Sequence, residues 1–75
     1  MVNYQPLWDI LDARRIKKTE LRNEAGLSSS TMAKLGKNEY VALSVLTRIC
    51  KVLNCQIGDV CRIETGEEGI EPHEQ

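Results

Sequence analysis

Residues 25–37 of the chain, AGLSSSTMAKLGK, place three consecutive serines at the start of a segment with helical apolar spacing. One hydroxyl suffices to cap a helix, because the N-cap oxygen accepts a hydrogen bond from a backbone N–H two or three residues later. Ser28 is well placed for that role. Ser29 and Ser30 then have two possible interpretations. They form a surface that exchanges hydrogen bonds with a ligand, or they are two solvated residues that follow a cap. The three serines by themselves do not distinguish the two.

The other reactive side chains form no catalytic or metal-binding set. The single histidine, His73, lies near the end of the chain, and no glycine loop of the kind that cradles phosphate is present. Cys50, Cys55 and Cys61 are odd in number and fit no usual zinc spacing. We expect no enzyme, no cofactor and no metal site, with the cysteines as ordinary thiols and a thiol sensor at Cys55 as the minor alternative.

Charge divides the chain into two parts. Residues 1–63 hold all ten Lys and Arg with six acids, a net charge of +4, whereas residues 64–75 hold five Glu and no Lys or Arg, a net charge of −5. We therefore expect one small folded domain over residues 1–64 and a disordered acidic tail over 65–75. No apolar run approaches the roughly 18 residues that cross a bilayer, which predicts a cytoplasmic protein with no membrane partner.

Apolar spacing predicts five short helices and an all-α fold. Tyr4, Leu7, Trp8 and Leu11 mark the first helix, with Asn3 as its cap and an end near Arg14, and Thr19 is the start signal of the second. Met32 and Leu35 mark the third helix, which stops at Gly36 or Asn38. The stripe of Leu43, Leu46, Ile49, Cys50 and Leu53 marks the fourth helix, which Asn54 closes. Ile57, Val60 and Cys61 mark a single-turn fifth helix, and residues 62–64 either form a short edge strand or trail off.

Gly26 is the central turn of this arrangement. It ends the second helix as a left-handed C-terminal glycine does, and only Leu27 separates it from the cap Ser28. Two helices joined so tightly must cross at a steep angle, as in a helix-turn-helix unit.

The segment from Lys18 to Asn38 resembles the helix-turn-helix of small bacterial regulators of the Cro/repressor (XRE-like) type, and the resemblance continues through LSVLTRICKVLNCQIGDV to cover about residues 4–63. It implies a lambda-repressor-like domain that reads double-stranded DNA with its third helix, about residues 28–37, in the major groove. One departure stands out, because Arg22 occupies a position that is usually Ala in this family.

Carried over by position, the resemblance implies two sets of contacts. The residues that would face bases are Ser29, Ser30, Lys34 and Thr31. The residues that would contact phosphates are Lys17, Lys18, Thr19, Ser28, Lys37 and Asn38. Serine discriminates poorly among bases because it both donates and accepts, and the alternative for the lysines is a solvated face with no ligand.

The leading hypothesis is a transcriptional regulator of the repressor type that binds DNA as a homodimer, since one recognition helix covers only a few base pairs. The helix 4–5 region and residues 62–65 are the candidate dimer surfaces, and the sequence does not select between them. The alternative is a protein-interaction module, such as an antitoxin or adaptor, on the same scaffold, with the acidic tail binding a protein partner.

Overall fold

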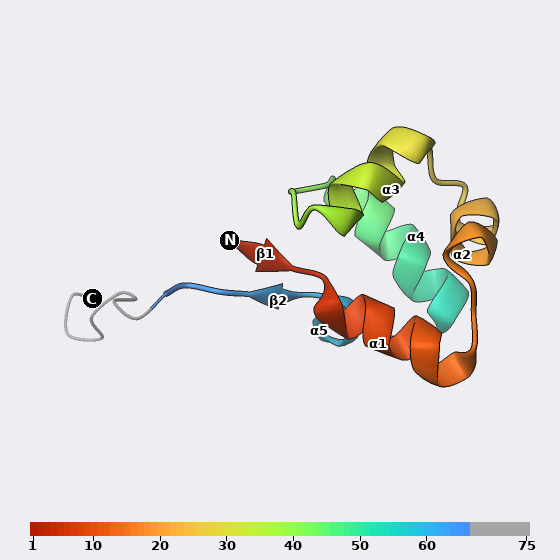
Figure 1. Cartoon of the computed structure of the whole chain (residues 1–75), viewed down its shortest axis with the longest axis horizontal. Helices are drawn as coiled ribbons and strands as arrows, with labels where there is room; N and C mark the ends of the chain where they lie inside the picture. The colour runs from red at the N-terminus through yellow and green to blue at the C-terminus, as the bar shows by residue number, and fades with distance from the viewer. Residues whose placement is uncertain (67–75) are drawn as a thin grey trace.

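Five helices lie within residues 1–66, the part of the chain that the computed structural model describes (Figure 1). They are α1 (Gln5–Arg14), α2 (Lys18–Ala25), α3 (Ser29–Gly36), α4 (Leu43–Leu53) and α5 (Ile57–Val60). Their order confirms the prediction from apolar spacing. Beyond Gly66 the predicted acidic tail lies outside the described residues. Between residues 1 and 66, no helix is long and apolar enough to span a bilayer.

Two predicted helix starts differ from the observed ones. Tyr4, not Asn3, is the N-cap of α1, although the Asn3 Oδ1 accepts a hydrogen bond from the Gln5 N–H at 2.8 Å. The second helix starts at Lys18, before Thr19, and the backbone N–H of its N-cap donates to Glu20 Oε1 at 2.8 Å. The Glu20 carboxylate thus accepts the hydrogen bond of the N-cap residue Lys17, and Thr19 is not the capping group.

The turn between α2 and α3 has the predicted geometry. Gly26 is left-handed, with φ 66° and ψ 40°, a conformation that costs other residues a steric penalty. The Leu27 N–H donates to the Arg22 carbonyl at 2.9 Å, and the Leu27 side chain is buried. With Leu27 and Ser28 alone between Gly26 and α3, the third helix departs in a new direction, as Figure 1 shows.

Helix α4 lies across the core. It packs against α2 and α5, and α5 in turn packs against α1. The buried apolar side chains come from every helix, from the first strand and from two connecting positions, Tyr4 and Leu27: Val2, Tyr4, Leu7, Leu11, Leu21, Ala25, Leu27, Leu35, Val45, Leu46, Ile49, Leu53 and Val60. The predicted stripe on α4 is wrong at its first position, since Leu43 is 66% exposed and Val45 is buried instead. The stripe therefore begins at the third residue of the helix.

A two-stranded antiparallel sheet joins the two ends of the described chain. Strands β1 (Val2–Asn3) and β2 (Arg62–Ile63) pair with Val2 opposite Ile63. The Met1 ammonium group donates to the Glu64 carbonyl and the Glu64 N–H donates to the Met1 carbonyl, both at 2.7 Å. The predicted five-helix fold is confirmed, and the structure adds one small sheet, in which the edge-strand alternative for residues 62–64 is confirmed over Arg62–Ile63.

Candidate nucleic-acid interface

Ser28 is the cap of α3. Its Oγ accepts a hydrogen bond from the Thr31 N–H at 3.0 Å, and its hydroxyl donates to Thr31 Oγ1, also at 3.0 Å. The Ser28 hydrogen is therefore used inside the first turn, and a phosphate would have to displace that bond to accept it. Thr31 is half-buried beside it, with its own hydroxyl hydrogen still available.

The exposed face of α3 carries the other predicted base-contacting residues. Ser29, Ser30 and Lys34 are all exposed, and no described part of the chain buries them. Ser30 and Lys34 are four residues apart, so their side chains are neighbours on one face of the helix. This arrangement leaves the hydrogen-bonding groups of Ser30 and Lys34 available to a ligand. Contact of these side chains with bases stays a prediction.

Arg22 makes a contact that the sequence did not predict. Its Nη1 donates to the Ser29 Oγ at 3.0 Å, across the turn at Gly26. Both side chains are exposed. The presence of arginine at a family position that is usually alanine was the available signal, but only the angle between α2 and α3 brings the two groups together. Arg22 therefore joins the residues of the candidate interface.

Three predicted phosphate contacts lie together at the start of α2. Lys17, Lys18 and Thr19 are all exposed. The Lys18 ammonium lies 4.4 Å from the centroid of the Trp8 ring, a cation–π geometry that restrains the side chain without neutralising its charge. Trp8, half-buried on α1, thus has one part in the core and another beneath this cation.

The other predicted phosphate contacts follow α3. Lys37 is exposed, whereas Asn38 is tied to the fold: it is left-handed, with φ 57°, and its Oδ1 accepts from the Tyr4 N–H at 2.9 Å. The Tyr4 hydroxyl donates to the Glu39 carbonyl at 2.8 Å. Two hydrogen bonds therefore hold the segment after α3 against the start of α1. Asn38 retains its amide N–H groups for a phosphate, but its oxygen has a structural role.

The model of the Cro/C1-type HTH DNA-binding domain matches residues 6–66, which include the turn, the exposed α3 face and both lysine groups. The chain belongs to this family. The match favours DNA binding over the protein-interaction alternative.

Two known proteins are similar to this Cro/C1-type chain over most of its length. An uncharacterized HTH-type transcriptional regulator of Bacillus subtilis (strain 168), YozG, is 34% identical over 61 residues, which are 79% of this chain and 73% of that protein. The crystal structure of the transcriptional regulator VanUg (Form II) superposes with a TM-score of 0.80 at 54% identity and covers 81% of each chain. The fold and the family are those of transcriptional regulators.

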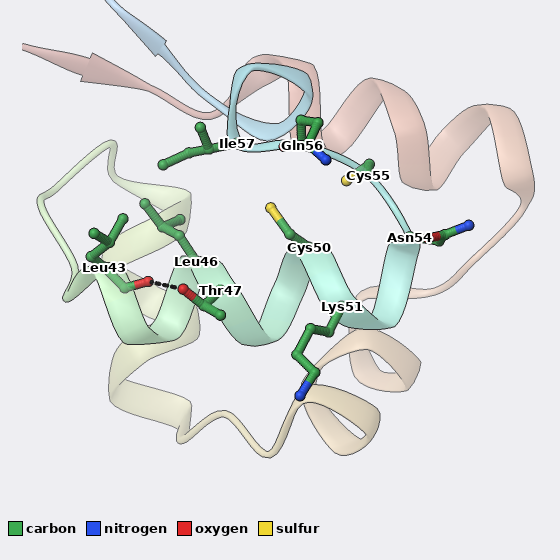
Figure 2. A pocket seen from close by; sticks show the side chains of 9 residues that line it. All are labelled: Leu43, Leu46, Thr47, Cys50, Lys51, Asn54, Cys55, Gln56 and Ile57. Carbon is green, nitrogen blue, oxygen red and sulfur yellow. Dashed lines mark hydrogen bonds between the residues drawn. The ribbon is translucent and has the colours of Figure 1, made fainter.

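The cysteines of this Cro/C1-type domain lie away from the α3 face. Figure 2 shows the Cys50 sulfur directed from α4 into a groove of about 430 Å³ between α4 and α5, which Cys55 also lines. Burial raises the pKa of the Cys50 thiol, and the neighbouring Cys55 thiol raises it further; burial also raises the pKa of Cys61. Both thiols are therefore weaker acids than an ordinary cysteine. No group of three or more metal-ligating side chains occurs within residues 1–66.

Proposed function

We propose that this protein is a sequence-specific regulator of transcription that inserts α3 into the major groove of double-stranded DNA. The observation that carries the proposal is the exposed face of α3, with lysines on both sides of it. Lys17 directly precedes α2, Lys18 is the first residue of α2, and Lys37 directly follows α3. Contacts to phosphate fix register, and contacts to base edges supply sequence choice. The proposed place of action is the cytoplasm, with the DNA that it regulates.

The salt dependence of binding tests the electrostatic part of this proposal. Each phosphate that a protein neutralises adds roughly −0.9 to the slope of log K against log salt concentration. Lys17, Lys18 and Lys37 thus predict a slope of roughly −2.7 per chain, and about twice that for a dimer. Lys37→Ala should make the slope shallower by about 1 per chain. Lys51→Ala removes the same charge from an exposed position of α4 where no contact with DNA or with a second copy is proposed, and is the control.

Selection of bound fragments from a random duplex library tests the sequence-reading part. Replacing Lys18 by alanine should weaken binding to all fragments about equally, because a phosphate contact carries no base information. Replacing Ser30 or Lys34 should change the selected sequence. Affinity that does not respond to salt, together with no enriched sequence, would overturn the proposal.

We also propose that two copies bind DNA together through an exposed apolar patch made by Tyr40, Leu43, Ile57 and Ile63. These side chains are 44–70% exposed. Tyr40, Ile57 and Ile63 line one depression, and Ile57 also lines the α4–α5 groove with Leu43. Figure 2 shows Leu43 and Ile57 at the same end of that groove. A contiguous apolar surface on a small domain is typical of an interface, and the patch includes both sequence-predicted dimer regions.

A charge substitution at Leu43 tests this patch by sedimentation equilibrium. Leu43 is the first residue of α4, where an acidic side chain suits the helix dipole, so Leu43→Glu should keep the fold. We expect the wild type to sediment as a dimer and Leu43→Glu as a monomer. Ser44→Glu adds the same charge at the next exposed position and should remain a dimer. A monomeric wild type, or a dimeric Leu43→Glu variant, would contradict this assignment.

A further inference from the structure

The hydrogen bond from Arg22 to Ser29 bears on what the third helix can read. Serine alone is a weak discriminator, because its hydroxyl donates to one base and accepts from another. Here the Ser29 Oγ accepts from the Arg22 Nη1 at 3.0 Å. A guanidinium group only donates, so the serine hydrogen cannot point toward it. Because one of its two lone pairs accepts from Arg22, the Ser29 hydrogen is directed away from Arg22, and the side chain presents this hydrogen and one remaining lone pair to a ligand.

Arg22 presents donors beside it. The guanidinium carries five N–H groups in a fixed fork, and the bond to Ser29 uses one of them. Because Arg22 is exposed, the other donors remain open to a ligand. Arg22 and Ser29 thus form a pair of adjacent donors with no carboxylate or carbonyl acceptor between them.

The location of the pair connects the two predicted contact groups. Arg22 and Ser29 line one shallow depression of about 390 Å³, whose rim includes Lys18 and Thr19 at the start of α2. A duplex that contacts α2 by its phosphates and α3 by its base edges would lie over this depression. The donor pair would then stand at a groove edge.

We infer that Arg22 and Ser29 together select guanine, by a mechanism in which Arg22 directs the Ser29 hydroxyl hydrogen toward the base and donates alongside it. Guanine is the base that presents two adjacent acceptors, N7 and O6, in the major groove. Adenine and cytosine present amino donors there, which a donor pair disfavours. This inference rests on the proposed function, since it requires α3 to lie in the major groove.

The test compares base preferences of the full-length wild type with Arg22→Ala, Ser29→Ala and the double variant, using a random duplex library and then single-base variants of the selected site. We expect the wild type to require guanine at one position of each half-site. Both single variants should lose that requirement, with guanine discrimination reduced roughly 5- to 100-fold. The double variant should lose no more than Arg22→Ala, because the two groups act as a unit.

Lys51→Ala is the charge-matched control and should keep the guanine requirement. Far-UV circular dichroism should show that Arg22→Ala folds, since both members of the pair are exposed and alanine is usual at this family position. An unchanged base preference in Arg22→Ala, or equal weakening on every sequence, would overturn the inference while leaving DNA binding intact. A wild type that binds no duplex would overturn the proposed function and this inference with it.

Discussion

Replacing Tyr4 by phenylalanine removes one hydroxyl and leaves a buried ring in place. Tyr4 is 1% exposed, and its hydroxyl donates to the Glu39 carbonyl at 2.8 Å. A neutral hydrogen bond contributes about 0.5–1.5 kcal/mol net to folding. Glu39 is exposed, so water can partly solvate the carbonyl that loses its partner, and we expect a loss of about 1 kcal/mol. In a domain of this size that loss lowers Tm by about 4–8 °C.

Thermal unfolding followed by far-UV circular dichroism measures this change, with Tyr40→Phe as the control. Tyr40 is 70% exposed, and its substitution should alter stability by less than about 0.5 kcal/mol. If Tyr4→Phe unfolded at the same temperature as Tyr40→Phe, the Tyr4 hydroxyl would not stabilise the segment after α3, and our interpretation of that contact would be refuted.

The pH dependence of the stability difference between the wild type and Tyr4→Phe tests the same contact. Burial raises the pKa of Tyr4 above its ordinary value, and the nearby Cys61 adds to the shift. A raised pKa means that the folded state holds the phenolic proton more tightly than the unfolded state does. The stabilisation is therefore complete below the ordinary tyrosine pKa of about 10 and is lost as pH rises through the raised value. The wild-type advantage over Tyr4→Phe should shrink at alkaline pH.

Three further predictions concern the core, the turn and the thiols. Leu35→Ala removes a side chain that is 0% exposed and should cost about 2–5 kcal/mol in urea unfolding; a loss below 1 kcal/mol would show that α3 is not anchored there. Gly26→Ala should cost about 1–2 kcal/mol, because φ is +66° while the new Cβ would meet only Arg48 Nη1 at 3.9 Å. Gly36→Ala, at an ordinary helical position with open space, should be neutral or stabilising by up to about 1 kcal/mol, and equal effects of the two glycine changes would contradict the left-handed turn. Since burial raises the pKa of Cys50 and Cys61, alkylation of both by iodoacetamide should be slow at neutral pH and accelerate as pH rises past the ordinary thiol pKa of about 8.5; rapid modification at pH 7 would refute their burial.

The parts of the fold that local chemistry determines were predictable from the sequence. Gly26 and Ser28 act on their immediate neighbours, as a left-handed stop and a helix cap, and both have the predicted roles. Asn54, left-handed at φ 54°, likewise ends α4 as expected. The match to the Cro/C1-type family confirms the assignment that these signals supported.

The features that were missed depend on residues far apart in the chain. The β1–β2 pairing joins strands of two residues each, too short to show alternation, and its partners are about 60 residues apart. Arg22 contacts Ser29 only because the turn sets the angle between two helices. The helical spacing predicts Leu43 in the core, but the first two residues of α4, Leu43 and Ser44, lie outside the buried layer, which begins at Val45. The bond from the Tyr4 N–H to Asn38, which gives a predicted phosphate contact a structural role as well, is non-local in the same way.

The central position of α4 has a consequence for genetic screens. This one helix supplies Leu46, Ile49 and Leu53 to the core beneath α2 and α5, and it carries Leu43 in the apolar patch. Loss-of-function alleles should therefore accumulate in α4 even though none of the predicted DNA contacts belongs to it. Second-site suppressors can distinguish the two kinds of allele. Substitutions elsewhere that raise the stability of the fold should rescue the core alleles of α4. Alleles at Leu43 should be rescued only by changes that restore the association of two copies.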